Sequence, residues 1–130
     1  MARLEHVNVT VADPDGTAEM LCRVFGWRRR WQGAAMTTGR TIHVGNDDSY
    51  VALFSYGDAV PSKAETYRTR GGLNHIAVVV DDFEGTEHRI RAAGYQPGAH
   101  HDYAPGRRFY FTEENGIEIE VVCYGSHRDL

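Results

Sequence analysis

An internal repeat is the feature of this sequence that most constrains its fold. Residues 4–13 read LEHVNVTVAD and residues 73–82 read LNHIAVVVDD, so the second copy follows the first by 69 positions. Each copy begins with Leu-x-His, continues as an alternating run rich in β-branched residues, and ends in acidic residues that can cap a helix. The repeat predicts two copies of one supersecondary unit. Neither copy is expected to close a core alone, because a chain segment of about 60 residues buries too little surface.

A helix is expected after each copy of the repeat. The segment PDGTAEMLCRVFGWR follows the first copy, with apolar residues at helical spacing and Gly26 as the stop. The segment FEGTEHRIRAAGYQ follows the second copy, with Gly94 as the stop. Short alternating segments then predict strands near 27–32, 40–44 and 50–56 in the first half, and near 95–99, 107–112 and 117–124 in the second.

The order of these elements predicts an α+β fold made of two βαβββ modules. We assign the modules to residues 1–56 and 73–130 of a single domain, 1–130, and the polar segment 57–72 with its Gly and Pro residues to the linker. The two sheets are expected to pair into a curved, half-open barrel. A cup lined by the inner faces of both sheets is where a small-molecule ligand would bind.

Charge and composition exclude several classes of partner. The formal net charge of −4 argues against nucleic acid, and the basic clusters 28–30 and 107–108 are expected on solvated strand faces. No apolar run approaches the ~20 residues of a membrane span, and the N-terminus lacks the regions of a signal peptide. Cys22 and Cys123 have no metal-binding spacing and are expected to be buried thiols, which indicates a reducing, cytoplasmic location.

Two histidines occupy equivalent positions of the repeat. Alternation places His6 on the same strand face as Asn8, and His75 takes the matching position of the second copy. A pseudo-twofold axis between the modules would bring both imidazoles toward one centre. For each histidine taken alone, the alternative is a structural role in which the ring is hydrogen-bonded within the protein. The matched pair favours a metal site.

Glu120 is the candidate carboxylate for that site. An offset of 68 aligns Glu120 in GIEIEVV with Ala52 in YVALFSY, so the first module carries a methyl group where the second carries a carboxylate. Two histidines and one carboxylate with open coordination positions suit Fe(II), with Mn(II) or another divalent ion as an alternative. A solvated strand residue is the other interpretation of Glu120, because Glu118 shares its face.

These motifs resemble the vicinal oxygen chelate superfamily, which includes glyoxalase I, bleomycin-resistance proteins and extradiol dioxygenases. The resemblance covers essentially the whole chain and is carried by LEHVNVTVAD, LNHIAVVVDD and RRFYFTEENGIEIEVV. It implies that His6, His75 and Glu120 are metal positions, and that Ala52 stands where glyoxalase I has a fourth ligand. The implied ion is Fe(II) or Mn(II), with Ni or Zn as alternatives.

Two further residues carry a resemblance to the extradiol dioxygenases. In those enzymes a catalytic His stands nine residues before a Tyr, which stands ten residues before the ligand Glu; His101, Tyr110 and Glu120 have the same spacing. The resemblance therefore assigns proton transfer to Tyr110 and His101. A solvent-facing loop residue is the alternative for His101, which follows His100 directly.

The lining of the predicted cup comes from the faces that carry the candidate ligands. Its expected substrate-binding residues are Asn8, Tyr50, Ala52 and Phe54, for which ordinary core packing is the alternative. The histidines without a patterned partner are expected to be structural or exposed: His43, His88 and His127.

Two classes of function remain open at this point. The first is a divalent-metal enzyme acting on a small molecule with vicinal oxygens: Ala52 favours a dioxygenase-like site, and the short two-module chain favours a glyoxalase-type lyase or isomerase. The second is a metal-free small-molecule binding protein of the bleomycin-resistance type, against which the retention of all three metal positions counts. A homodimer is expected by analogy with short members of the superfamily.

Overall fold

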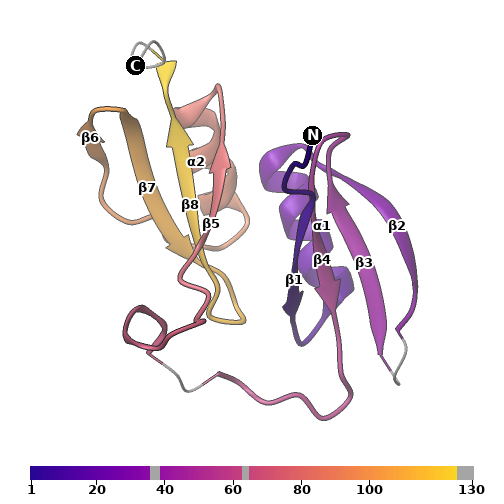
Figure 1. Ribbon diagram of the computed structural model, residues 1–130. Helices are drawn as coiled ribbons and strands as arrows, with labels where there is room; N and C mark the ends of the chain where they lie inside the picture. Colours follow the sequence, from indigo (N-terminus) through magenta and orange to yellow (C-terminus); the bar gives the residue numbers. More distant parts are fainter. Residues whose placement is uncertain (36–38, 63–64, 126–130) are drawn as a thin grey trace. The chain divides into compact units, whose positions relative to one another are not determined.

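The computed structural model describes residues 1–35, 39–62 and 65–125 (Figure 1). The chain divides into two compact units, residues 1–60 and 61–130. The predicted boundary lay in the linker 57–72, and the structure attaches most of that linker to the second unit. The second module was predicted to run to residue 130, and its last five residues lie outside the described part of the chain.

The first unit is a βαβββ module with a four-stranded sheet. Strand β1 runs parallel to β4, whereas the β4–β3 and β3–β2 pairs are antiparallel, which gives the strand order β1-β4-β3-β2. A parallel pair requires a crossover connection, and the helix supplies the first part of it. The elements are β1 (His6–Thr10), α1 (Pro14–Phe25), β2 (Arg28–Ala34), β3 (Arg40–Gly45) and β4 (Tyr50–Phe54).

The second unit repeats this topology after one turn of 3-10 helix. Its strand order is β5-β8-β7-β6, with β5 parallel to β8 and the other pairs antiparallel. The α+β class and the two βαβββ modules predicted from the repeat are thereby confirmed. The elements are η1 (Thr66–Arg68), β5 (Ile76–Val79), α2 (Phe83–Ala92), β6 (His101–Tyr103), β7 (Gly106–Thr112) and β8 (Glu118–Cys123).

Each core lies between a helix and one face of its own sheet. Helix α1 packs on β3, β4 and β2, and α2 packs on β8. The main buried residues of the first core are Val9, Ala18, Leu21, Val24, Ile42, Val44, Val51 and Leu53. Those of the second core are Val78, Phe83, Ile90, Phe109, Phe111, Ile119 and Val121.

The side chains between these core positions lie on the opposite face, because successive residues of a strand point to opposite sides of the sheet. We call it the helix-free face of each sheet. In the first sheet it carries His6, Asn8, His43, Tyr50, Ala52 and Phe54. In the second it carries His75, Ala77, Arg108, Tyr110, Glu118 and Glu120.

The helix boundaries follow the signals in the sequence. Gly26 ends α1 in the left-handed region at φ 71°, where a side chain would be strained, and its N–H donates to the carbonyl of Cys22. Asp82 begins α2 by accepting a hydrogen bond from the backbone N–H of Gly85. Helix α2 ends at Ala92, and Gly94 follows at φ 97°.

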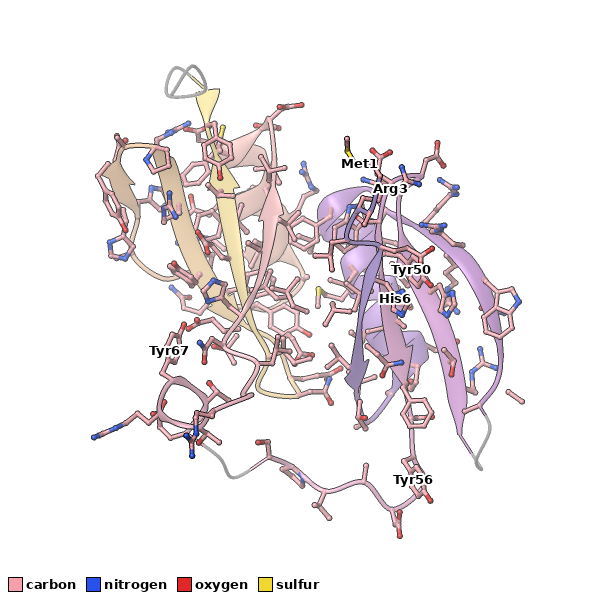
Figure 2. All side chains as sticks on the ribbon, in the orientation of Figure 1. Met1, Arg3, His6, Tyr50, Tyr56 and Tyr67 are labelled. Carbon is pink, nitrogen blue, oxygen red and sulfur yellow. The ribbon has the colours of Figure 1, made fainter. Side chains whose placement is uncertain are left out.

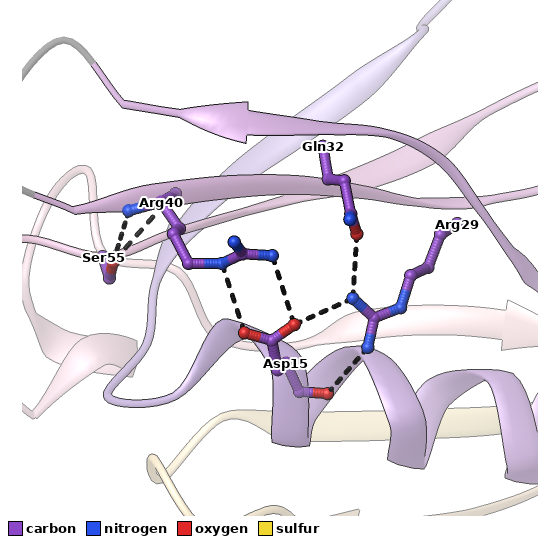
Figure 3. A network of polar contacts seen from close by, with 5 residues as sticks. All are labelled: Asp15, Arg29, Gln32, Arg40 and Ser55. Atoms are coloured by element: carbon purple, nitrogen blue, oxygen red, sulfur yellow. Dashed lines mark hydrogen bonds and ion pairs between the residues drawn. The ribbon is translucent and has the colours of Figure 1, made fainter.

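Asp15 ties the start of α1 to the sheet of the first unit (Figure 3). Its carboxylate accepts from Arg29 Nη1 at 2.9 Å and pairs with Arg40 Nε at 3.2 Å. These two guanidinium groups lower the pKa of Asp15, the hydrogen bond from Arg29 contributing most. The basic run 28–30 had led us to expect a solvated Arg29. Arg29 is instead bonded to the start of α1.

One predicted strand is wrong. Residues 95–99 form no strand, and β6 starts two residues later at His101. The Tyr95 N–H donates to the carbonyl of Ile90 at the end of the helix, and Pro97 has no N–H to donate. One backbone hydrogen bond, from Gly98 N–H to the carbonyl of Tyr110 at 2.7 Å, joins this segment to β7. The alternation of residue types was present there, but the backbone donors were engaged elsewhere or missing.

Cys123 is buried as expected, whereas Cys22 is half-buried, and neither forms a disulfide bond. Within the described residues, neither helix has the length and apolar composition that crossing a membrane requires.

Candidate metal centre

The two sheets carry their candidate site residues in matching registers. Asn8 pairs with Ala52 between β1 and β4, and Ala77 pairs with Glu120 between β5 and β8. The pairing therefore reproduces the alignment made from the sequence, in which Ala52 and Glu120 are equivalent. Only the second sheet has a carboxylate at this position.

His75 and Glu120 are neighbours in the second unit. The Nε2 atom of His75 lies 3.1 Å from Oε1 of Glu120. The side chain of Glu120 is 7% exposed and that of His75 is 31% exposed, so the pair is partly shielded from water but reachable. His75 directly precedes β5 rather than lying within it. The structure thus brings together two of the three predicted ligands.

Arg108 holds the other oxygen of Glu120. Its Nη1 donates to Oε2 of Glu120 at 2.9 Å, while its Nε atom is buried without a hydrogen-bond partner. The basic pair 107–108 had led us to expect a solvated Arg108. Only 16% of its side chain is exposed. The ion pair leaves Oε1 of Glu120 as the oxygen that faces His75.

Tyr67 and Glu118 lie on the opposite side of the His75 ring. The hydroxyl of Tyr67 donates to Oε1 of Glu118 at 2.8 Å and lies 3.1 Å from Nδ1 of His75. The hydrogen bond to Glu118 raises the pKa of Tyr67 to about 12. Neither residue was among the site residues predicted from the sequence, and Tyr67 belongs to the segment assigned there to the linker.

Tyr110 and His101 lie next to this pair. The ring of Tyr110 meets that of His75 edge to face at 5.6 Å between centroids, and that of His101 at 6.5 Å. Burial, followed by the charge of Glu120, raises the pKa of the Tyr110 phenol. His101 is exposed on β6, opposite Arg108 in β7. The predicted proton-transfer residues and the predicted ligands of the second unit therefore occupy one side of one sheet.

His6 lies on the helix-free face of the first sheet. Its Nδ1 is 2.9 Å from Oε1 of Glu5, and its ring stacks on Tyr50 at 4.8 Å between centroids (Figure 2). The guanidinium group of Arg30 covers the Tyr50 ring at 4.5 Å. Burial, followed by the charge of Glu5, raises the pKa of the Tyr50 phenol.

His43 extends this stack, which fits the structural role that was one of the two expectations for it. Its ring stacks on Tyr50 at 4.4 Å and lies 5.1 Å from that of Trp31. Burial, followed by the charges of His6 and Arg30, lowers the pKa of His43. In the folded sheets His43 pairs with Ala52 as Tyr110 pairs with Glu120. His43 thus holds the position in the first sheet that Tyr110 holds in the second.

The other predicted cup residues lie on the same face as His6. Asn8 is exposed, Tyr50 and Phe54 are half-buried, and Ala52 is buried. Of the remaining histidines, His88 is exposed as expected, and His127 lies outside the described residues. The four predicted cup residues thus belong to a face of mixed aromatic and polar character, which is only partly exposed.

No group of three or more His, Cys, Asp or Glu side chains in the described parts of the chain is arranged to hold a metal ion. The second unit instead supplies a converging pair, His75 and Glu120, and His6 belongs to the first unit. One imidazole nitrogen and one carboxylate oxygen are donors that suit first-row divalent ions. The residues present in the second unit therefore fit part of the ligand set that the sequence predicts.

Comparison with known proteins identifies the family. The model of the Glyoxalase/Bleomycin resistance protein/Dioxygenase superfamily matches residues 3–121. The chain belongs to this superfamily, which confirms the resemblance to vicinal oxygen chelate proteins. No curated protein sequence is similar enough to count as a relative.

Solved structures with the same fold include proteins from three bacteria. A glyoxylase/bleomycin resistance protein/dioxygenase domain from Frankia sp. EAN1pec has 18% identity and a TM-score of 0.80, over 95% of this chain and 93% of that one. The fosfomycin resistance protein FosX from Mesorhizobium loti has 22% identity and a TM-score of 0.70, over 94% and 91%. FosX from Listeria monocytogenes, complexed with Mn(II) and 1S,2S-dihydroxypropylphosphonic acid, has 17% identity and a TM-score of 0.71, over 94% and 90%.

Proposed function

We propose that this chain is a divalent-metal-dependent enzyme of the vicinal oxygen chelate type that acts on a small molecule with vicinal oxygens. His6, His75 and Glu120 would hold the ion and leave open positions for the substrate. The observation that carries the proposal is the 3.1 Å approach of His75 Nε2 to Glu120 Oε1. An imidazole nitrogen and a carboxylate oxygen are both donors that suit first-row divalent ions. His75 and Glu120 would therefore hold the ion from neighbouring positions of the second sheet.

The donor set favours Fe(II) or Mn(II), with Ni or Zn as alternatives, because two imidazoles and one carboxylate with open positions are typical of such sites. The structural similarity to FosX, which in one crystal structure holds Mn(II) together with a vicinal diol, supports the same class of ion and ligand. We propose a dioxygenase-like variant of the site, since Ala52 leaves out the fourth protein ligand.

Tyr110 and His101 would serve proton transfer. When bound, the ion would supply Lewis-acid polarisation and a template for two substrate oxygens. Tyr110 is a phenol whose proton is retained at neutral pH, so it can donate a hydrogen bond to a substrate oxygen. The ring of His101 is 6.5 Å from that of Tyr110, which allows it to exchange a proton with the same substrate region through water.

The aromatic residues of the first sheet would contribute to substrate binding. The Tyr50 ring lies between those of His6 and His43 and is covered by Arg30, so its position is held on several sides. We assign a substrate-binding role to Tyr50 together with Asn8, Ala52 and Phe54. We further propose that the protein acts as a homodimer.

A metal-free binding protein is the second candidate, and one observation favours it. Arg108 pairs with Glu120 at 2.9 Å, so the buried carboxylate is neutralised without any cation. In that case the helix-free faces would sequester a ligand without chemistry. The two candidates differ in whether ligand binding requires metal.

The test is the metal content of protein purified without a His tag. We expect about one ion per chain in the wild type and a large loss in both His6→Ala and His75→Ala. His88→Ala serves as the control, because His88 is exposed on α2, the helix that covers the other face of the sheet that carries Glu120. Unchanged metal content in the first two variants would contradict the ligand assignment. Ligand binding that persists in metal-free protein would favour the second candidate.

A further inference from the structure

Tyr67 is held against His75 by its own local structure. It lies in the 3-10 turn η1, eight residues before His75 in the sequence. The side chain of Glu65 caps this turn by accepting a hydrogen bond from the Tyr67 N–H at 3.2 Å, and the Thr69 hydroxyl donates to the Glu65 carbonyl at 2.7 Å. The phenol is thus presented from a closed turn to the Nδ1 side of the His75 ring.

The contacts of this cluster assign the proton of Tyr67 and the proton on Nδ1 of His75, which also lies 3.6 Å from Oε1 of Glu118. A phenol has a single proton, and an ionised carboxylate can only accept, so the 2.8 Å contact assigns the Tyr67 proton to Glu118. The phenol oxygen then offers a lone pair to His75, 3.1 Å away, and Nδ1 of His75 must be the donor. Nε2 faces Oε1 of Glu120 at 3.1 Å, so it is the nitrogen at which a metal ion would replace the proton shared with that carboxylate.

We propose that Tyr67 and Glu118 are positioning residues that orient His75 as a metal ligand. Histidine ligands generally donate their second N–H to an acceptor that sets the tautomer and the ring orientation. Here the acceptor is the phenol oxygen of Tyr67, and Glu118 orients that phenol. The proposal rests on the proposed function in assuming that Nε2 of His75 binds metal, and it adds a role for the segment between the two modules.

The first test is the affinity for Mn(II), measured from the EPR signal of the free ion. Tyr67→Phe removes the hydroxyl and keeps the ring, and we expect it to weaken Mn(II) binding about 10- to 100-fold. Tyr95→Phe is the matched control, because its ring packs beside Phe111 on the core side of the second sheet. Tyr67→Phe with wild-type affinity would overturn the proposal.

A double-substitution cycle tests whether Glu118 acts through Tyr67. If it does, combining Glu118→Gln with Tyr67→Phe should weaken Mn(II) binding by less than the product of the two separate factors. A loss equal to that product would show that the two residues act independently and would overturn the relay.

The second readout needs neither metal nor activity. In metal-free protein with 15N-labelled histidine, the chemical shifts of the His75 Nδ1–H group should change in Tyr67→Phe and stay unchanged in Tyr95→Phe. A Tyr67→Phe spectrum with the wild-type shifts of His75 would overturn the hydrogen bond itself.

The metal affinities separate the two proposals. If the wild type does not bind Mn(II), or if His75→Ala binds it as tightly, the proposed function fails and the positioning role fails with it. Wild-type binding through His75 that is unaffected in Tyr67→Phe overturns the positioning role alone.

Discussion

Glu120 in β8 and Ala52 in β4 occupy the same place in two modules of one topology. Their partners, Ala77 and Asn8, are also equivalent in the repeat. The two positions have opposite chemistry, since one carries an ionised carboxylate paired with Arg108 and the other a methyl group. The helix-free faces of the two sheets therefore differ in chemistry although the fold is repeated, and the carboxylate paired with Arg108 belongs to the second sheet.

Glu120→Gln should lower the affinity for Mn(II) at least about tenfold, because the negative charge is lost at nearly constant shape. Isothermal titration with Mn(II) measures the effect. Glu114→Gln is the control, because Glu114 is exposed in the turn that precedes β8. Equal affinities in wild type and Glu120→Gln would remove Glu120 from the ligand set.

The wild-type protein should be a poor glyoxalase. A site of the glyoxalase I type uses a carboxylate at the position of Ala52 as ligand and base, and losing a general base costs about 10²–10⁴-fold in rate. Turnover of a hemithioacetal by metal-loaded protein measures this directly. Efficient turnover would contradict the dioxygenase-like assignment.

Catechol-like ligands should perturb the spectrum of Fe(II)- or Mn(II)-loaded protein, and Ala52→Glu should weaken their binding by filling a coordination position. Ala52 is 2% exposed, so any larger side chain also adds steric strain. Ala52→Gln has nearly the same size without the charge and separates the two effects. Equal losses in both variants would indicate crowding alone.

Glu113→Ala should destabilise the protein by about 1–3 kcal/mol, because it removes the buried carboxylate that accepts from two half-buried backbone N–H groups. Glu113 is 3% exposed, counted over the whole residue. Its carboxylate accepts from the backbone N–H groups of Asn115 and Ile117 at 2.7 and 3.0 Å. Urea unfolding measures the free energy. Its exposed neighbour gives the control: Glu114→Ala should change stability by less than about 0.5 kcal/mol.

The contribution of Asp15 to stability should depend on pH. The pKa of Asp15 in the folded protein lies below the ordinary value of 3.8, so the contribution is fully present above that value and is lost as the pH falls through the lowered pKa. The difference in unfolding free energy between wild type and Asp15→Asn should therefore be constant from neutral pH to about pH 5 and shrink below about pH 4. A difference that grows on acidification would contradict this coupling to Arg29 and Arg40.

The repeat was sufficient to predict the module architecture, because its signals are local. Alternating residues, acidic helix starts and glycine stops act within a few positions of the chain, and Gly26 and Asp82 do what these signals indicate. The same alternation placed Glu118 and Glu120 on one face of their strand. The strand expected at 95–99 was wrong because pattern alone does not report which backbone donors are already engaged.

The amino-acid sequence by itself therefore determined the topology of each module and the faces on which the candidate residues lie. Tertiary structure decided which side chains meet across that face: Tyr67 with Glu118, 51 positions apart, and Arg108 with Glu120. The physical reason is that periodicity defines the direction of a side chain, whereas its lateral neighbours depend on strand register and on how loops fold back. Charge, tautomer and hydrogen-bond partners at His75 follow from those neighbours, and so they arise only in the folded chain.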